Sequence, residues 1–334
     1  MIVSVVSMPE GTVRRTPVSE ARERLAESGF LFVDAQLPEE APSGEPPIAR
    51  LLGLEAEDLS WLGREQETVR AEFLGDAAAF VVPAFEAGQV VRLHVVATER
   101  YLLAVHRGPA EVVENLIARI PHERPPDAVA TMFLLLGEAL ETYRRSAVQA
   151  LLDVEDLEDE MFRQREPEQL YRLARLRRTS ALLHHTLLPY HQAAEELITR
   201  RVLNRNFPEE RQRIAREYQR LSRLVLTDIE ALQEAARRGF STYSSLVSGE
   251  QNGVINRLAI VSTIFLPLSF LTGFFGMNFA YLTDELESRS IFWVLAVGLQ
   301  VLFLAGALYV LHRTRIWRRL HDDDSVDDES VDDA

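Results

Sequence analysis

Two long apolar segments near the C-terminal end of the chain constrain its fold more than any other feature. Residues 258–275 contain no charged side chain, and in residues 291–311 Gln300 is the only strongly polar one. A helix of about 20 apolar residues crosses the roughly 30 Å hydrocarbon core of a bilayer. Two neighbouring core helices of a soluble protein would have to be apolar on every face. The sequence therefore predicts a two-helix transmembrane domain over residues 258–312.

The rest of the 334-residue chain has the composition of a water-soluble protein, and it excludes several functions. The net charge of −15 disfavours binding to nucleic acid, which usually needs a basic surface. The absence of cysteine excludes disulfides and Cys-ligated metals. No phosphate-binding loop, nucleophile elbow or kinase motif is present, so we expect no enzyme. Residues 1–8 lack the features of a signal peptide, so the C-terminal segments should direct membrane insertion.

Residues 1–122 mix strand-like and helix-like stretches, which predicts an α/β domain. Val18–Glu27 and Ala110–Ile120 have helical patterns, and the run Pro38–Pro47 is expected to be a loop. Stretches rich in β-branched and aromatic residues indicate a sheet. These stretches are Ile2–Val6, Phe30–Val33, Thr68–Phe73, Ala79–Val82, Val90–Ala97 and Tyr101–Val105.

Long helical periodicity replaces this mixture in residues 123–257. Apolar residues recur every three or four positions from 127 to about 165, and a second helix is expected at about 168–203. A third helix begins after Pro208 and meets no proline before Pro267. If unbroken, it would run about 90 Å and lead straight into the first apolar segment.

Arginine placement indicates how the two predicted spans are oriented. Arg257 precedes the first span and four arginines follow the second, whereas the connecting loop 276–290 carries three acidic residues against one arginine. Both termini are therefore expected in the cytoplasm, with both spans in the inner (plasma) membrane. The tail 313–334 is basic and then acidic, and its acidic part is expected to be disordered.

The end of the first span carries a set of short motifs. It reads Ser262-Thr263-Ile264-Phe265-Leu266-Pro267-Leu268 and then Gly273-Phe274-Phe275-Gly276-Met277-Asn278-Phe279, and the second span is followed by a basic end with Trp317. In this setting the Gly-Met-Asn triplet resembles the CorA magnesium transporter family, with the specific match covering about 248–320. The resemblance implies a homopentameric channel for Mg²⁺, with Co²⁺ also carried, that closes when intracellular Mg²⁺ rises. Two helices cannot enclose a pore, so several copies are required on geometric grounds as well.

The triplet itself suits the recognition of a hydrated ion. Mg²⁺ dehydrates reluctantly, so neutral oxygen acceptors can hold it through its water shell. A ring of Asn278 carbonyls from several copies would do so weakly enough to release the ion. Gly276, beside Met277, would permit a sharp departure from the helix. The simpler alternative is that Gly276 and Asn278 only cap the helix.

One helical face leads back from the triplet at intervals of three and four residues. By resemblance it corresponds to the pore lining, in which apolar rings can lose water and close while polar or small positions stay wet. The alternative is that this face packs against the second span. The face consists of Gly273, Ser269, Leu266, Ser262, Leu258, Ile255 and Asn252.

The loop 276–290 and the stalk, which is the part of the long third helix before the first span, depart from the family pattern. Phe279 is followed by Ala280 instead of a glutamate, and the nearest acidic counterpart in the outer loop is Asp284 with Glu285. Ser241 stands where many relatives place an acidic residue. An altered acidic funnel leaves the preferred ion open. A transporter for Zn²⁺, Co²⁺ or Ni²⁺ on the same scaffold is therefore the main alternative, and a membrane-tethered coiled-coil protein is the alternative from another class.

Polar side chains in the soluble part have modest predicted roles. Glu217 falls where relatives place a ligand for regulatory Mg²⁺. The acidic run between Asp153 and Glu160 resembles the acidic helical arms of the family, although such a run is more often a solvated face. His184, His185 and His191 lack the spacing of a metal site, so surface or packing roles are expected.

Overall fold

The computed structural model describes residues 1–8, 10–26, 29–39, 48–54, 59–64, 67–74, 77–202, 208–277, 290 and 292–313. The chain divides into two compact units. The first holds residues 1–160 and 166–239, and the second holds residues 161–165 and 240–334. The predicted change from an α/β part to long helices lies inside the first unit. The predicted membrane segments lie in the second.

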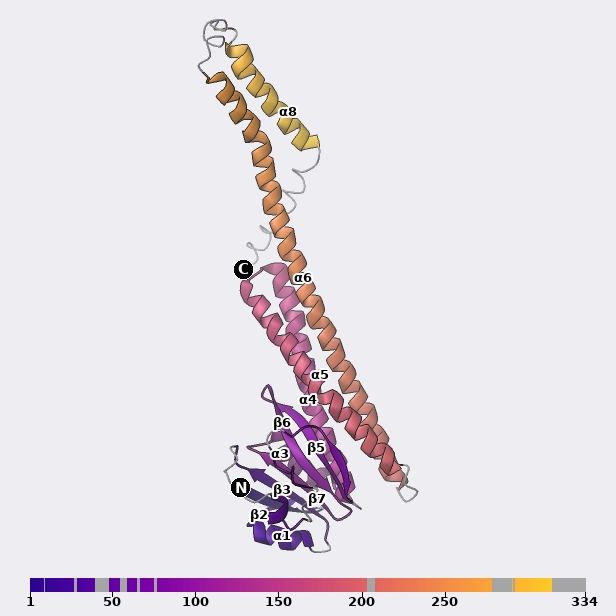
Figure 1. Ribbon diagram of the computed structural model, residues 1–334. Helices are drawn as coiled ribbons and strands as arrows, with labels where there is room; N and C mark the ends of the chain where they lie inside the picture. The colour runs from indigo at the N-terminus through magenta and orange to yellow at the C-terminus, as the bar shows by residue number, and fades with distance from the viewer. Residues whose placement is uncertain are drawn as a thin grey trace. The chain divides into compact units, whose positions relative to one another are not determined.

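A seven-stranded mixed sheet forms the centre of the first unit (Figure 1). Its order is β2-β1-β3-β7-β6-β5-β4, with β3 and β7 parallel and every other neighbouring pair antiparallel. The strands are β1 (Ile2–Ser7), β2 (Thr12–Thr16), β3 (Leu31–Leu37), β4 (Ala71–Leu74), β5 (Ala77–Glu86), β6 (Gln89–Ala97) and β7 (Tyr101–Arg107).

Helices cover both faces of this sheet, which confirms the predicted α/β class. Apolar side chains of α1 (Val18–Ala26) and α2 (Ile48–Leu51) pack with Val33, Val81 and Val105 on one face. On the other face, α3 (Glu111–Glu123) and the long helices pack with Phe32, Leu93 and Leu102 in a second core. Strand residues alternate between the two cores because successive side chains of a strand point to opposite faces.

Three long helices follow the sheet, at nearly the predicted positions. They are α4 (Ala128–Arg163), α5 (Pro167–Val202) and α6 (Glu209–Phe275). Helix α6 spans 67 residues without interruption, including Pro267, which corresponds to about 100 Å at 1.5 Å per residue. The expected strands are all present with shifted ends. Most of the expected loop Pro38–Pro47 lies outside the described residues.

Strand β5 ends in two contacts that position helices. The Glu86 carboxylate accepts hydrogen bonds from the backbone N–H groups of Glu111 and Val112, at 2.9 and 2.8 Å, and so caps the N-terminus of α3. The backbone N–H of Phe85 donates to the Thr142 hydroxyl of α4 at 2.9 Å. One strand end therefore fixes two helices against the sheet.

The start of the stalk helix α6 is fixed by Arg211. Its guanidinium bonds Glu99 beside strand β6 and Asp127 at the start of α4, with closest distances of 2.8 Å to each. Asp127 also accepts the backbone N–H of Ala130 at 2.7 Å, so it caps α4. Arg211 and its two carboxylate partners thus tie α4, α6 and the sheet together.

His94 lies in the core beside Trp61 and is only 2% exposed. Its Nδ1 accepts a hydrogen bond from the backbone N–H of Gly63 at 3.0 Å. Burial, aided by Arg107 and Arg92, lowers the pKa of His94 from 6.5 to about 4. The folded protein therefore holds this imidazole neutral, whereas the unfolded chain protonates it below pH 6.5.

Because its folded pKa is depressed, His94 should make the free energy of unfolding fall as pH drops from about 6.5 to about 4. The contribution reaches about 3 kcal/mol at most. We expect His94→Gln, which can still accept from Gly63, to remove this part of the pH dependence. Urea unfolding of the full chain in detergent, followed between pH 4 and 7.5, measures it. Equal pH slopes in the variant and the wild type would contradict the assignment.

Candidate functional site

The C-terminal part of α6 has the properties of a membrane-crossing helix. An 18-residue window in it has a mean hydropathy of 2.0, and none of that window is buried within the chain. A helix this apolar and this uncovered needs either lipid or other protein chains around it. It is the only helix of the described residues long and apolar enough to cross a membrane. The first predicted span is therefore a continuous helix.

The seven residues of the predicted lining face are all exposed in the single chain. Ile255, Leu258 and Leu266 have 61%, 65% and 71% of their surface exposed. Seven other residues between 253 and 275 are half-buried and lie about half a turn away around the helix. These are Gly253, Ile260, Ile264, Pro267, Leu268, Leu271 and Phe275. The structure thus leaves the predicted lining face open and covers the opposite face in part.

Hydroxyl groups on this helix bond back to its own backbone. Ser262 Oγ donates to the Leu258 carbonyl at 2.8 Å, Thr263 Oγ1 to that of Ala259 at 2.7 Å, and Thr272 Oγ1 to that of Leu268 at 2.7 Å. Each hydroxyl oxygen keeps its lone pairs free. Such groups can therefore sit in an apolar helix and still offer acceptors to a hydrated ion.

Helix α6 ends at Phe275, directly before Gly276. Its N–H still donates to the Thr272 carbonyl at 2.9 Å, and Gly276 is absent from the described residues with positive φ. A Cβ at this position would lie 3.1 Å from the Thr272 carbonyl oxygen. The glycine therefore allows a close backbone approach without a left-handed turn. Met277 is described and partly exposed, whereas Asn278, Asp284 and Glu285 lie outside the described residues.

The second apolar segment is helical from 292 to 313 but begins irregularly. Phe292–Gly298 forms a π-helical segment, η2, which continues as α8 (Leu299–Arg313). The apolar stretch of α8 alone, Leu299–Tyr309, is shorter than a full span. The sequence pattern did not predict the π-helical start. A run of uniformly apolar residues carries no periodicity that could separate the two helix types.

Glu217 lies on the exposed side of α6 and lines a cleft of about 630 Å³ in the first unit. Three other carboxylates line the same cleft, and each bonds an arginine: Glu123 and Glu138 bond Arg119, and Glu141 bonds Arg144. These hydrogen bonds raise the pKa of Arg119 and lower the pKa of Glu141. Glu217 makes no hydrogen bond or ion pair with another described residue. It is therefore the carboxylate of this cleft with free oxygens.

Other polar groups of the first unit lie on an exposed helix face or in helix contacts. Most of the acidic run of α4 is exposed, while Val154 and Leu157 point inward, as in a solvated helix face. His191 bridges α5 and α6 through Ser222, with 2.7 Å between Nδ1 and Oγ. Among the described residues, no three His, Asp or Glu side chains are grouped closely enough to hold a metal ion. The packing role expected for His191 is confirmed.

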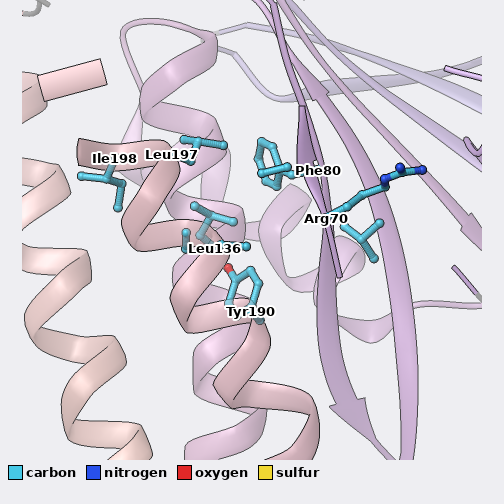
Figure 2. Close-up of a pocket in the computed structure, with 10 residues that line it drawn as sticks. Arg70, Phe80, Leu136, Tyr190, Leu197 and Ile198 are labelled. Carbon is cyan, nitrogen blue, oxygen red and sulfur yellow. The ribbon is translucent and has the colours of Figure 1, made fainter. Parts of the chain in front are cut away.

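An apolar cavity between β5 and the helices α4 and α5 is too small for a ligand (Figure 2). Phe80, Leu136, Tyr190, Leu197 and Ile198 line it, and its volume is about 10 Å³, the space of one water molecule. Among the described residues, Tyr218 has the hydroxyl that interacts with the buried Tyr190 hydroxyl, without the geometry of a regular hydrogen bond. Burial raises the pKa of Tyr190 well above 10.0. The cavity is a packing defect and not a substrate site.

Comparison with known proteins places these features in a family. The sequence matches the family described as CorA-like Mg2+ transporter protein over residues 27–313. A cobalt/magnesium transport protein CorA of Methanocaldococcus jannaschii is 24% identical over 80% of this chain and 86% of its own length. A zinc transport protein ZntB of Yersinia pseudotuberculosis is 22% identical over 66% of this chain and 67% of its own. The solved structure of the M. jannaschii CorA magnesium transporter matches with a TM-score of 0.76 and 19% identity, covering 94% of this chain and 98% of that one.

Proposed function

The chain belongs to the CorA-like Mg2+ transporter family, and from this premise we propose that it is a subunit of a homo-oligomeric channel for Mg²⁺ uptake. As a member of this family it transports divalent cations. The observation that carries the proposal is the continuous helix α6, which presents one open face of alternating small, polar and apolar residues along its apolar part.

Both apolar segments cross the inner membrane in this proposal, with the two termini in the cytoplasm. Arg257 before the first segment and the arginines after the second support this orientation, because basic residues stay on the cytoplasmic side. The exposed face of α6 then requires other copies of the chain around a common axis, since lipid would solvate Ser262 and Ser269 poorly. Five copies is the number that the family resemblance implies.

The triplet Gly276-Met277-Asn278 forms the outer mouth of the pore. The Asn278 carbonyls accept hydrogen bonds from the water shell of Mg²⁺ and leave its inner shell intact. Asp284 and Glu285 in the outer loop raise the local cation concentration. Below the mouth, Ile255, Leu258 and Leu266 form apolar rings that stop conduction when they lose water, and Asn252, Ser262, Ser269 and Gly273 form wider sections between them.

Zinc transport on the same scaffold is the second candidate, and the relatives named for zinc transport favour it. Purified protein in liposomes loaded with a Mg²⁺-sensitive dye tests the proposal. We expect Mg²⁺ influx that excess Co²⁺ reduces. Zn²⁺ influx without Mg²⁺ influx would assign the chain to the second candidate, and no flux of any divalent ion would refute transport by this chain alone.

Asn278→Ala should abolish Mg²⁺ influx and leave assembly intact, because the variant loses the acceptors that hold the hydrated ion. Asn256→Ala makes the same chemical change on α6 away from the proposed lining face, and it should retain flux. Liposome flux and size-exclusion chromatography of both variants provide the measurement. Wild-type flux in Asn278→Ala would show that the mouth is elsewhere.

Leu266→Ser should raise the basal leak, because a polar ring lowers the barrier to wetting. A barrier lowered by about 1.4 kcal/mol corresponds to roughly tenfold more leak. Leu271→Ser on the half-buried opposite side of α6 serves as the control. Leak is measured as dye response at high internal Mg²⁺. A leak that rises in the control and not in Leu266→Ser would mean that the lining face is misassigned.

Cytoplasmic Mg²⁺ should close the channel by binding between neighbouring soluble units, with Glu217 as one ligand. One chain offers no complete group of ligands among its described residues, so the second set must come from another copy. The free oxygens of Glu217 suit this role. An ion that binds the closed arrangement better shifts the population toward it.

Limited proteolysis of the full-length protein tests this regulation. Millimolar Mg²⁺, the range of weak oxygen-ligand sites, should protect the wild type. Protection should be weaker in Glu217→Ala and unchanged in Glu230→Ala, which removes an exposed carboxylate of α6 outside the cleft. Equal protection of all three proteins would remove Glu217 from the mechanism.

A further inference from the structure

Pro267 creates an unpaired backbone carbonyl in the apolar part of α6. Proline has no N–H, so the carbonyl of Thr263, four residues earlier, loses its helical hydrogen bond. The Thr263 hydroxyl cannot replace that donor, since it donates to Ala259 at 2.7 Å. In hydrocarbon, an unpaired carbonyl costs several kcal/mol, and neighbouring helices normally supply the missing partner. A donor is therefore needed beside Pro267.

Gln300 on α8 carries an unpaired donor in the second apolar segment. It is the only strongly polar residue of 291–311 and lies near the middle of that segment. Its side chain is half-buried, and its amide makes no hydrogen bond with any other residue that the structure describes. An amide at the centre of a bilayer is as costly as an unpaired carbonyl. The Gln300 amide can donate the hydrogen bond that the Thr263 carbonyl lacks.

The covered faces of the two helices place these groups at the same level. Among the residues of η2 and α8 whose burial is described, the half-buried positions are Val297 in η2 and Gln300 and Ala307 in α8. On α6 they include Leu271, Pro267 and Ile260. In an antiparallel pair 267 meets 300 and 260 meets 307, because both intervals are seven residues, and 271 lies within one residue of the level of 297. Between the levels of 267 and 260, Ile264 is half-buried, and Leu304 on α8 is 37% exposed against 70% for Leu302.

We propose that the Gln300 side-chain amide donates to the Thr263 carbonyl that Pro267 leaves free in the same chain. Gln300 is then a positioning residue, because it holds the second segment against the first at the proline and does not touch the ion. This inference rests on the proposed placement of both segments in a membrane. It adds a specific contact that fixes the proline region of the pore helix.

A double-mutant cycle tests the contact. Gln300→Met keeps the size of the side chain and removes the donor. It should shift the unfolding equilibrium of the full chain in detergent roughly 3- to 20-fold, the range of interhelical hydrogen bonds in membranes. Pro267→Ala restores the N–H that pairs with Thr263, so Gln300→Met should have little effect in that background. Gln300→Asn, which keeps an amide, should lose less than Gln300→Met.

Equal effects of Gln300→Met in both backgrounds would overturn the inference. Cysteine cross-linking gives a second measurement that does not depend on Pro267→Ala. Because the chain has no cysteine, Ile260→Cys with Ala307→Cys introduces the only thiols, and a short bifunctional reagent should join them within one chain. The pair Val261→Cys with Leu308→Cys, exposed positions one residue further along each helix, should not react.

Cross-links that form only between chains, or equally in both pairs, would also overturn the inference. Mg²⁺ uptake by the wild type in liposomes separates this result from the proposed function. A protein that conducts Mg²⁺ but shows additive substitutions retains the proposed function and lacks the Gln300 contact.

Discussion

The position of the stalk helix depends on the ion pairs of Arg211. Its guanidinium bonds both Glu99 and Asp127, and Asp127 also caps α4. A bidentate guanidinium fixes direction as well as distance. The two hydrogen bonds from Glu86 to α3 act in the same way at the end of β5. Charged groups at strand and helix ends thus fix α3, α4 and α6 relative to the sheet, and the apolar cores fill the space between these elements.

Ion pairing with arginine also separates the four glutamates that line the cleft around Glu217 into two kinds. Glu123, Glu138 and Glu141 bond arginines and are occupied by the fold. Glu217 lines the same cleft and keeps its oxygens free. The distinction cannot be derived from net charge, because all four residues are glutamates on helices. Glu123 and Glu141 bond arginines of their own helices, three or four residues away, whereas Glu138 of α4 meets Arg119 only because α3 and α4 pack together.

Much of this architecture follows from sequence periodicity, and the departures have physical reasons. Helices α4, α5 and α6 were predicted within a few residues, because long apolar repeats leave few alternatives. Strand β2 was not predicted, because most of its side chains are exposed and show no alternation. The π-helical start of the second apolar segment and the cleft around Glu217 were not predicted either. The first has no pattern in uniformly apolar sequence, and the second brings together residues about a hundred positions apart. The outer mouth at Asn278 remains a prediction.

The unbroken helix α6 also determines which kind of motion could act on the proposed pore. A helix bends gradually, and lateral displacement is absorbed over its length. A rotation about its own axis changes the direction of every side chain on it by the same angle. In the proposed pore, a rotation of α6 about its axis would therefore re-aim the apolar rings of its C-terminal part together. Each residue inserted or deleted before these rings would change their angular phase by about 100°, so helical phase is a property that the proposed gate depends on.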